Sequence, residues 1–117
     1  MSPIRDNGLV RNALFHPKVR DTVRAWPREV RRDLGEAFFA LQQGVVLGPP
    51  RSKPMRTVAV GVEELRIKDA DGQYRVFYLA KFAAGILVFH AFIKKTQQTP
   101  DRELKLARKR LKELQDG

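Results

Sequence analysis

The strongest constraint on the fold is a change of hydrophobic period at Glu64. From this residue on, apolar and polar residues alternate in the segments ELRIKD (64–69), YRVFYLAKF (74–82) and ILVFHAFIKK (86–95). Asp71-Gly72 separates the first two segments, and Ala83-Ala84-Gly85 separates the last two. Alternation at period two between turn signals, rich in aromatic and β-branched residues, is typical of β-hairpins. The sequence therefore predicts a three-stranded antiparallel meander over 64–95.

Apolar residues recur at helical spacing both before and after the meander. This spacing predicts helices over 17–26 and 28–43, joined at Pro27, with Gly44 ending the second helix, and a third helix from Pro100 onward. The half-apolar stretch 9–16 is typical of a short edge strand, and 45–62 is expected to be a long connection. This order predicts an α+β fold, with an N-terminal helical hairpin packed on a small antiparallel sheet and a C-terminal helix.

The bulk composition limits the kinds of protein that this chain can be. Its 117 residues suit one domain over 1–117. There is no cysteine and there are two histidines, so we expect no disulfide, no metal site and no cofactor. No apolar run approaches the roughly 20 residues of a membrane span, and Met1–Gly8 has no apolar signal core. We therefore expect a cytoplasmic protein without a membrane partner.

The net charge of +10 is the strongest global signal of function. A field of this sign attracts polyanions such as nucleic acid or an acidic partner. The basic residues are spread along the chain and do not form a terminal arm, so folding must assemble any polyanion site.

The turn signals also predict which residues face each other in the meander. A two-residue turn at Asp71-Gly72 places Lys68 opposite Arg75 and Arg66 opposite Phe77. If Ala84-Gly85 forms a two-residue turn as well, counting outward along the strands places Lys94 opposite Arg75 and Phe92 opposite Phe77. The result is a row of three cations with Arg66 beside it, all on one face.

A shift of the second hairpin by one residue would change this row. Arg75 would then face Ile93, and Lys95 would replace Lys94 on the cationic face. Like charges directly opposite each other destabilise a sheet, which favours an anion-binding site on this face. The alternative is that the cations lie in water at the fringe of the sheet, with Glu64 and Asp69 compensating their charge. No structural partner for Arg75 is evident in either case.

The other side chains of the strands indicate how the sheet packs. Leu65, Ile67, Val76 and Tyr78 share the opposite face, which we expect to pack on the N-terminal helices. Phe77 on the cationic face predicts partial cover by the C-terminal helix. His90 lies among apolar residues in its strand and is expected to be a hydrogen-bonded core histidine.

Several motifs resemble the phage-derived branch of the RelE/HigB toxins, which belong to bacterial type II toxin–antitoxin modules. The resemblance runs from about Trp26 to Leu114 and rests on the segments ELR (64–66), YRVFY (74–78) and FIKKTQQTP (92–100). It implies a RelE/ParE-like fold. It also implies a metal-independent endoribonuclease that cleaves mRNA on the 70S ribosome and inhibits translation. The implied partner is a cognate helix-turn-helix antitoxin that is HigA-like.

The resemblance also implies roles for particular cations. Arg75 matches the family's phosphate-contacting arginine, Arg66 a second basic position, and Lys94 and Lys95 a basic pair after the last strand. We therefore expect these four residues to be catalytic. Phosphate groups of RNA are expected to be bound by four further cations, which are Lys68, Arg51, Lys53 and Arg56.

The sequence departs from its relatives where some of them hold a general base. No tyrosine follows Tyr78, and lysines followed by Thr96 stand where other relatives have histidine and aspartate. The general base is therefore unassigned. Two alternatives remain open at this point. The chain could be a toxin of the same fold that binds a protein target such as gyrase, or a non-catalytic phage-derived protein that binds nucleic acid.

Overall fold

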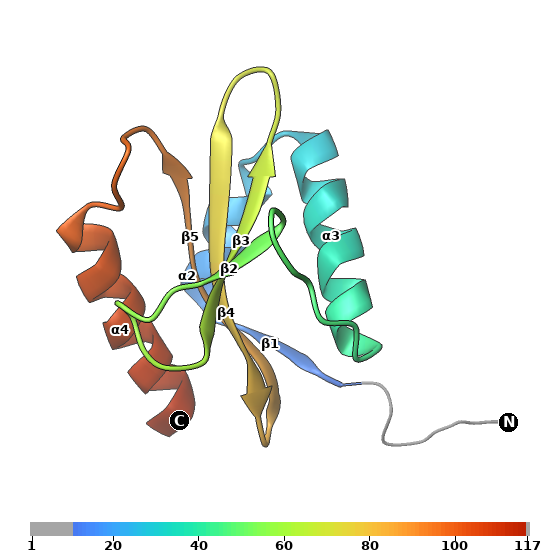
Figure 1. Cartoon of the computed structure of the whole chain (residues 1–117), viewed down its shortest axis with the longest axis vertical. Coiled ribbons are helices and arrows are strands. Elements are labelled where there is room, and N and C mark those ends of the chain that lie inside the picture. Colours follow the sequence, from blue (N-terminus) through green and yellow to red (C-terminus); the bar gives the residue numbers. More distant parts are fainter. Residues whose placement is uncertain (1–10, 117) are drawn as a thin grey trace, which may run out of the picture.

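The computed structural model describes residues 11–116. Its elements confirm the predicted α+β order (Figure 1). In chain order they are β1 (Ala13–Phe15), α2 (Pro17–Arg24), α3 (Arg28–Gln42), β2 (Ser52–Pro54), β3 (Val62–Lys68), β4 (Gln73–Phe82), β5 (Gly85–Lys94) and α4 (Asp101–Asp116).

The sheet is larger than the predicted meander and it is mixed. Its strand order is β1-β5-β4-β3-β2, and the antiparallel meander of β3, β4 and β5 is confirmed. The expected edge strand is present at Ala13–Phe15, but it runs parallel to β5, so the sheet is not purely antiparallel. The expectation for positions 9 and 10 lies outside the described residues. Strand β2 was not predicted, because three residues that end in a proline carry no readable period.

Helices cover both faces of the sheet, as Figure 1 shows with α3 and α4 on opposite sides of the strands. Helices α2 and α3 pack on one face, in a core that includes Val19, Leu34 and Phe38. The face that they cover carries Leu65, Ile67, Val76 and Tyr78, as predicted. Helix α4 packs on the other face through Ala107 and Leu111, which share a second core with Phe77 and Leu79. The predicted cover of Phe77 by the C-terminal helix is confirmed.

The first hairpin has a different register from the predicted one. Its loop has four residues, because the Asp69 carboxylate accepts hydrogen bonds from the N–H groups of Asp71 and Gly72, both at 2.9 Å. An Asp side chain that binds the backbone in this way creates its own turn. The pairing is therefore displaced by two residues: Arg66, not Lys68, lies opposite Arg75, and Lys68 lies opposite Gln73. An even displacement leaves every side chain on its predicted face.

The second hairpin also departs from both predicted registers. Arg75 faces Phe92, and neither Lys94 nor Ile93 lies opposite it. Phe77 pairs with His90, so its predicted pairing with Phe92 was wrong as well. The cause is the position of the turn, which is Ala83-Ala84 with Phe82 opposite Gly85. The turn lies one residue earlier than predicted, which displaces the pairing by two residues. Two irregularities in the ladder, between residues 77 and 78 and between 79 and 82, shift the register by one residue in opposite directions and cancel.

The pairing of β5 nevertheless shows which of Lys94 and Lys95 lies on the same face of the sheet as Arg75. Lys94 lies opposite Gln73 and therefore shares the face of Arg75. Lys95 follows the last residue of β5. The row predicted as Lys68, Arg75 and Lys94 is in fact two rows, one of Arg66, Arg75 and Phe92 and one of Lys68, Gln73 and Lys94.

Candidate functional site

Four of the predicted cations meet on the face of the sheet that carries α4. Arg66 and Arg75 lie directly opposite each other on β3 and β4. The Arg66 N–H donates to the Arg51 carbonyl at 2.8 Å, which places Arg51 at the next position outward. Together with Lys68 these residues line a pocket of about 410 Å³, which we call the arginine pocket. The predicted concentration of positive charge on this face is therefore present.

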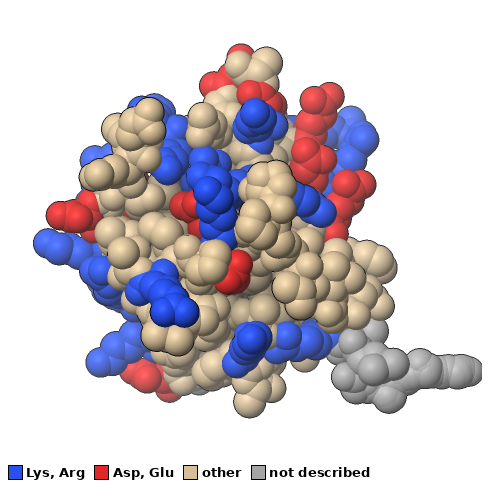
Figure 2. Space-filling view, in the orientation of Figure 1, with Lys and Arg blue, Asp and Glu red and all other residues tan. Residues whose placement is uncertain are grey.

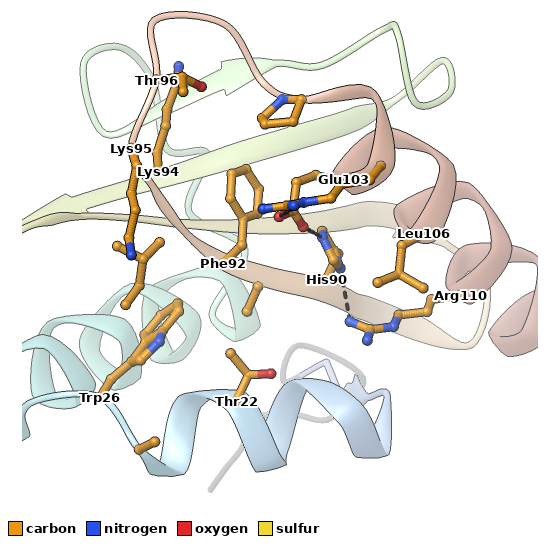
Figure 3. A pocket seen from close by; sticks show the side chains of 15 residues that line it. Thr22, Trp26, His90, Phe92, Lys94, Lys95, Thr96, Glu103, Leu106 and Arg110 are labelled. Atoms are coloured by element: carbon orange, nitrogen blue, oxygen red, sulfur yellow. Dashed lines mark hydrogen bonds and ion pairs between the residues drawn. The ribbon is translucent and has the colours of Figure 1, made fainter.

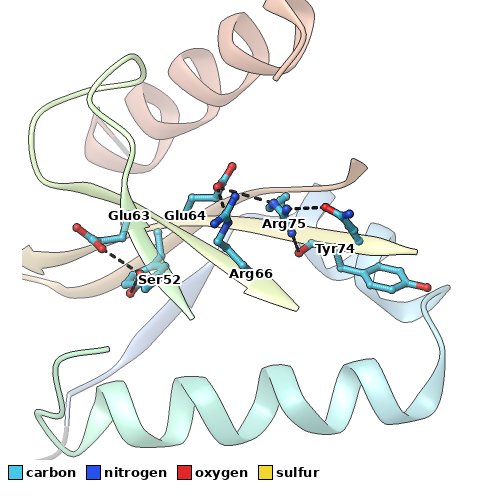
Figure 4. Close-up of polar contacts among 8 residues, drawn as sticks. Ser52, Glu63, Glu64, Arg66, Tyr74 and Arg75 are labelled. Atoms are coloured by element: carbon cyan, nitrogen blue, oxygen red, sulfur yellow. Dashed lines mark hydrogen bonds and ion pairs between the residues drawn. The ribbon is translucent and has the colours of Figure 1, made fainter. Parts of the chain in front are cut away.

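Arg75 is held more firmly than the sequence indicated. Its side chain is buried at 5% exposure, one terminal nitrogen donates to Gln73 Oε1 at 2.8 Å, and the other donates to the Tyr74 carbonyl at 3.2 Å (Figure 4). Its Nε lies 3.7 Å from Glu64 Oε1. Burial lowers the pKa of Arg75, and the charge of Glu64 opposes this shift. The expectation that Arg75 has no structural partner was wrong.

Glu64 lies between the two arginines and compensates part of their charge. Its carboxylate is buried, and its Oε1 is 3.3 Å from Arg66 Nε. Glu64 thus offsets the cations, as the alternative interpretation expected, but the group is in the protein interior and not at a solvated fringe. The Nε donors of Arg66 and Arg75 are buried without a hydrogen-bond partner. Both Nε atoms lie near Glu64 Oε1, so it is the four cations lining the pocket that suit it to an anion with several oxygen atoms.

The other predicted cations do not line the arginine pocket. Lys53 lies opposite Glu64 on the adjoining strand β2 and is exposed, so the register directs it to the same face. Arg56 is exposed just after β2, next to the segment whose Thr57 carbonyl accepts a hydrogen bond from Arg108 of α4. Lys94 and Lys95 line a separate cleft beside β5.

This second cleft contains a polar cluster that sequence reasoning missed (Figure 3). His90, at 2% exposure, lies 2.7 Å through its Nε2 from Glu103 Oε1, and Arg110 donates to its Nδ1 at 2.9 Å. These contacts fit a neutral ring with its proton on Nε2. Burial lowers the pKa of His90, and the hydrogen bond with Glu103 only partly opposes this shift. His90 is thus the hydrogen-bonded core histidine that we predicted.

The partners of His90 had a signal in the sequence that could have identified them. Glu103 and Arg110 are seven residues apart, which is two helical turns, and therefore share one side of α4. Two polar residues on that side, among the apolar positions that face the sheet, indicate a buried polar partner. His90 is the titratable side chain that the adjacent strand supplies.

The described part of the chain shows neither a metal cluster nor a membrane span. No group of three or more His, Cys, Asp or Glu side chains within residues 11–116 is placed to hold a metal ion. No helix in the same range combines the length and apolar character needed to cross a membrane.

The fold and the comparisons together define the class of protein. The three helices of the described range and the five-stranded mixed sheet are compatible with a RelE-like fold. Residues 21–112 match the family described as phage-derived protein Gp49-like. The chain belongs to this family, which contains RelE/HigB-like toxins. Comparison with curated proteins gives no match.

Proposed function

We propose that the protein is the toxin of a type II toxin–antitoxin module and that it cleaves mRNA on the ribosome without a metal. Membership of a toxin-like, phage-derived family supports the first part, and this family implies an antitoxin partner. The observation that carries the second part is the arginine pocket, which is lined by four cations, Arg51, Arg66, Lys68 and Arg75. The proposed antitoxin is a HigA-like helix-turn-helix protein.

The chemistry that this pocket suits is transfer within the RNA backbone. A ribose 2′-oxygen attacks the adjacent phosphorus, the bond to the 5′-oxygen breaks, and the products are a 2′,3′-cyclic phosphate and a 5′-hydroxyl. Negative charge develops on the phosphoryl oxygens in the transition state, and fixed cations stabilise it. In this proposal Arg66 and Arg75 contact the reacting phosphate, with Lys94 and Lys95 contributing from the end of β5.

The remaining cations suit the neighbouring phosphates of the same strand. Arg51 and Lys68 line the pocket, and Lys53 and Arg56 continue the positive surface along β2. Figure 2 shows Lys and Arg side chains spread over the visible face of the molecule. Within residues 11–116, those that line the arginine pocket include no histidine, carboxylate or tyrosine, and Glu64 is engaged with both arginines. We therefore expect cleavage of ribosome-bound mRNA and not of free RNA.

The test is induced expression in a bacterium without an antitoxin, followed by mapping of mRNA 5′ ends by primer extension. We expect growth arrest and new ends within translated codons. Arg66→Ala and Lys94→Ala should each lower cleavage by on the order of 10². Arg32→Ala removes the same charge from the exposed face of α3 and should leave cleavage unchanged.

Arg75 needs a gentler substitution because it is part of the fold. Arg75→Ala would remove two hydrogen bonds and leave Glu64 with one partner, which we expect to cost about 1–3 kcal/mol of stability. Arg75→Lys keeps the charge and loses the planar donor geometry. It should lower cleavage while the protein stays folded.

Two results would contradict the proposal. Normal growth with soluble, folded protein present would exclude the toxin function. Growth arrest with intact mRNA ends would exclude the nuclease and favour a protein target such as gyrase.

A further inference from the structure

Strand β5 is covered by another strand along only part of its outer edge. Within residues 11–116, β1 pairs with Ile86, Leu87 and Val88, and β4 is the sole strand neighbour of β5 beyond Val88. The uncovered part borders the cleft of about 640 Å³ that Figure 3 shows between α2 and α4. Every residue from 90 to 96 lines this cleft, and such an uninterrupted run means that the cleft follows the edge of the strand. We call residues 90–94 the open edge.

The hydrogen-bonding pattern of the sheet shows which backbone groups point into the cleft. The Arg66 N–H donates to the carbonyl of Arg51, the residue just before β2, so the peptide groups of Arg66 point away from β4. Those of Arg75, directly opposite, then point toward β5, because antiparallel pairs alternate between bonded and non-bonded positions. Phe92 therefore bonds to β4, and the N–H and C=O groups of Ala91 and Ile93 face outward.

We propose that the open edge binds an extended acidic peptide segment as an additional strand. The identity of the partner rests on the proposed function, under which this segment is part of the antitoxin. An edge with unpaired backbone groups is a template for strand addition, in which main-chain hydrogen bonds supply affinity and alternate side chains supply specificity.

Charge determines which kind of segment fits. Lys94, Lys95, Arg102 and Arg110 line the cleft, and its acidic residue, Glu103, is paired with His90. A second copy of this chain would bring the same cations against one another, which net charge +10 makes unfavourable. An acidic segment would instead pair with the lysines.

The walls of the cleft indicate the pattern of that segment. Trp26 lies on the side of α2, whereas Phe92 and Leu106 lie on the side of α4. A strand beside β5 directs successive side chains to opposite sides. Alternating acidic and apolar residues therefore fit the cleft, with the apolar ones against one of these walls.

Binding here would also act on the proposed RNA site. Lys94 lies on the face of Arg75, in the row that contains Gln73 and Lys68. A carboxylate paired with Lys94 removes a cation that the RNA backbone needs. The same contact that docks the segment would thus compete with RNA.

The opposite edge of the sheet is a poorer template. Strand β2 has three residues and ends in Pro54, which has no N–H to donate. Short edge strands with proline and lysine resist strand addition. The open edge of β5 carries no such residue among positions 90–93.

The test uses purified protein and a capped synthetic peptide of roughly eight residues in which Glu and Val alternate. Calorimetry measures its affinity, and NMR measures amide exchange of the ¹⁵N-labelled protein. We expect slowed exchange at Ala91 and Ile93. Ile93→Pro removes one outward N–H, is tolerated at an edge, and should weaken binding by about tenfold or more. Ile93→Ala, the matched control, keeps the N–H and should bind within about threefold of the parent.

A second arm leaves the protein unchanged. In one peptide, N-methyl groups on alternate residues remove the N–H donors along one edge of the peptide strand, so that this edge cannot form the hydrogen bonds of a sheet with β5. In another peptide, Lys replaces Glu, so that the charge has the same sign as that of the cleft. Both should bind at least about tenfold more weakly than the acidic peptide. This arm decides the question if Ile93→Pro fails to fold.

Several results would overturn the proposal. These are absence of binding by the acidic peptide, equal binding by the N-methylated peptide, or slowed exchange on β2 in place of β5. Self-association in sedimentation that Ile93→Pro abolishes would assign the edge to a second copy. None of these readouts depends on RNA cleavage. Peptide binding without cleavage would refute the proposed nuclease and leave the docking site intact.

Discussion

At the scale of single residues, His90 connects the sheet to α4 through two hydrogen bonds. Arg110 donates to Nδ1 and Nε2 faces Glu103, so the folded protein stabilises the neutral ring. The pKa of His90 is lowered below its ordinary value of 6.5, mainly by burial. A proton added to Nδ1 would break the bond from Arg110. The buried contact therefore makes the stability of the fold depend on pH.

We expect the free energy of unfolding to fall when the pH drops from about 7.5 to about 5.5. Because the folded pKa is depressed, the unfolded chain binds the proton first, so this stability is present above about pH 6.5 and is lost below it. Urea titrations at the two pH values measure the effect, and His90→Gln should show a smaller loss. The carboxyl of Glu113 has a lowered pKa through its hydrogen bond with His16, so it titrates below this range. An identical loss in His90→Gln would show that another group is responsible.

At the scale of elements, two glycines make opposite demands on the backbone. Gly35 lies inside α3 at an exposed position where an added Cβ meets nothing within 4 Å. Gly85 opens β5 with φ of +130°, and an added Cβ would collide with the Asn12 carbonyl oxygen. The glycine at 85 is required by the close approach of the chain before β1, while the glycine at 35 only weakens its helix.

Alanine at the two positions should therefore change stability in opposite directions. Gly35→Ala should raise the free energy of unfolding by about 0.5–1 kcal/mol, because alanine has the higher helix propensity. Gly85→Ala should lower it by more than about 2 kcal/mol, because the backbone must move to relieve the contact. Chemical denaturation of the two variants, each serving as the control for the other, measures both. A neutral Gly85→Ala would mean that β1 and β5 are not held together as described.

At the scale of the whole molecule, the net charge of +10 governs how the protein meets its partners. The arginine pocket and the open edge both present cations, one to phosphates and one to carboxylates. Such charge accelerates association and makes affinity depend on salt. RNA and an acidic segment would therefore compete most strongly at low ionic strength.

We expect the affinity for a single-stranded oligoribonucleotide to fall steeply with salt. Each phosphate contact contributes a slope of about −0.7 in a plot of log K against log salt concentration. Lys68→Ala should reduce the slope by about one such contact. Arg32→Ala, on the exposed face of α3, should change it less. Fluorescence anisotropy over a salt series measures both, and a slope near zero would contradict an electrostatic RNA site.

The sequence by itself determined the features that depend on local periodicity. The alternation in 64–69, 74–82 and 86–95 placed Arg66, Lys68 and Arg75 on one face and Ile67 and Tyr78 on the other. Pairing errors of two residues leave these faces unchanged, because side chains alternate with period two. The order of helices and strands and the cover of Phe77 by α4 could also be predicted, because they follow from local periodicity.

Only the tertiary structure decided which residues meet. The carboxylate of Asp69 sets the register of the first hairpin and the turn at Ala83-Ala84 sets that of the second, and neither leaves a periodic signal in the sequence. A partner distant in the chain, such as Arg110 for His90, became visible only after folding, and so did the burial of Glu64 beside Arg75. The open edge likewise depends on where β1 ends beside β5 and on how α2 and α4 flank it. Period and turn chemistry are local properties, whereas register, burial and clefts arise from packing between distant segments.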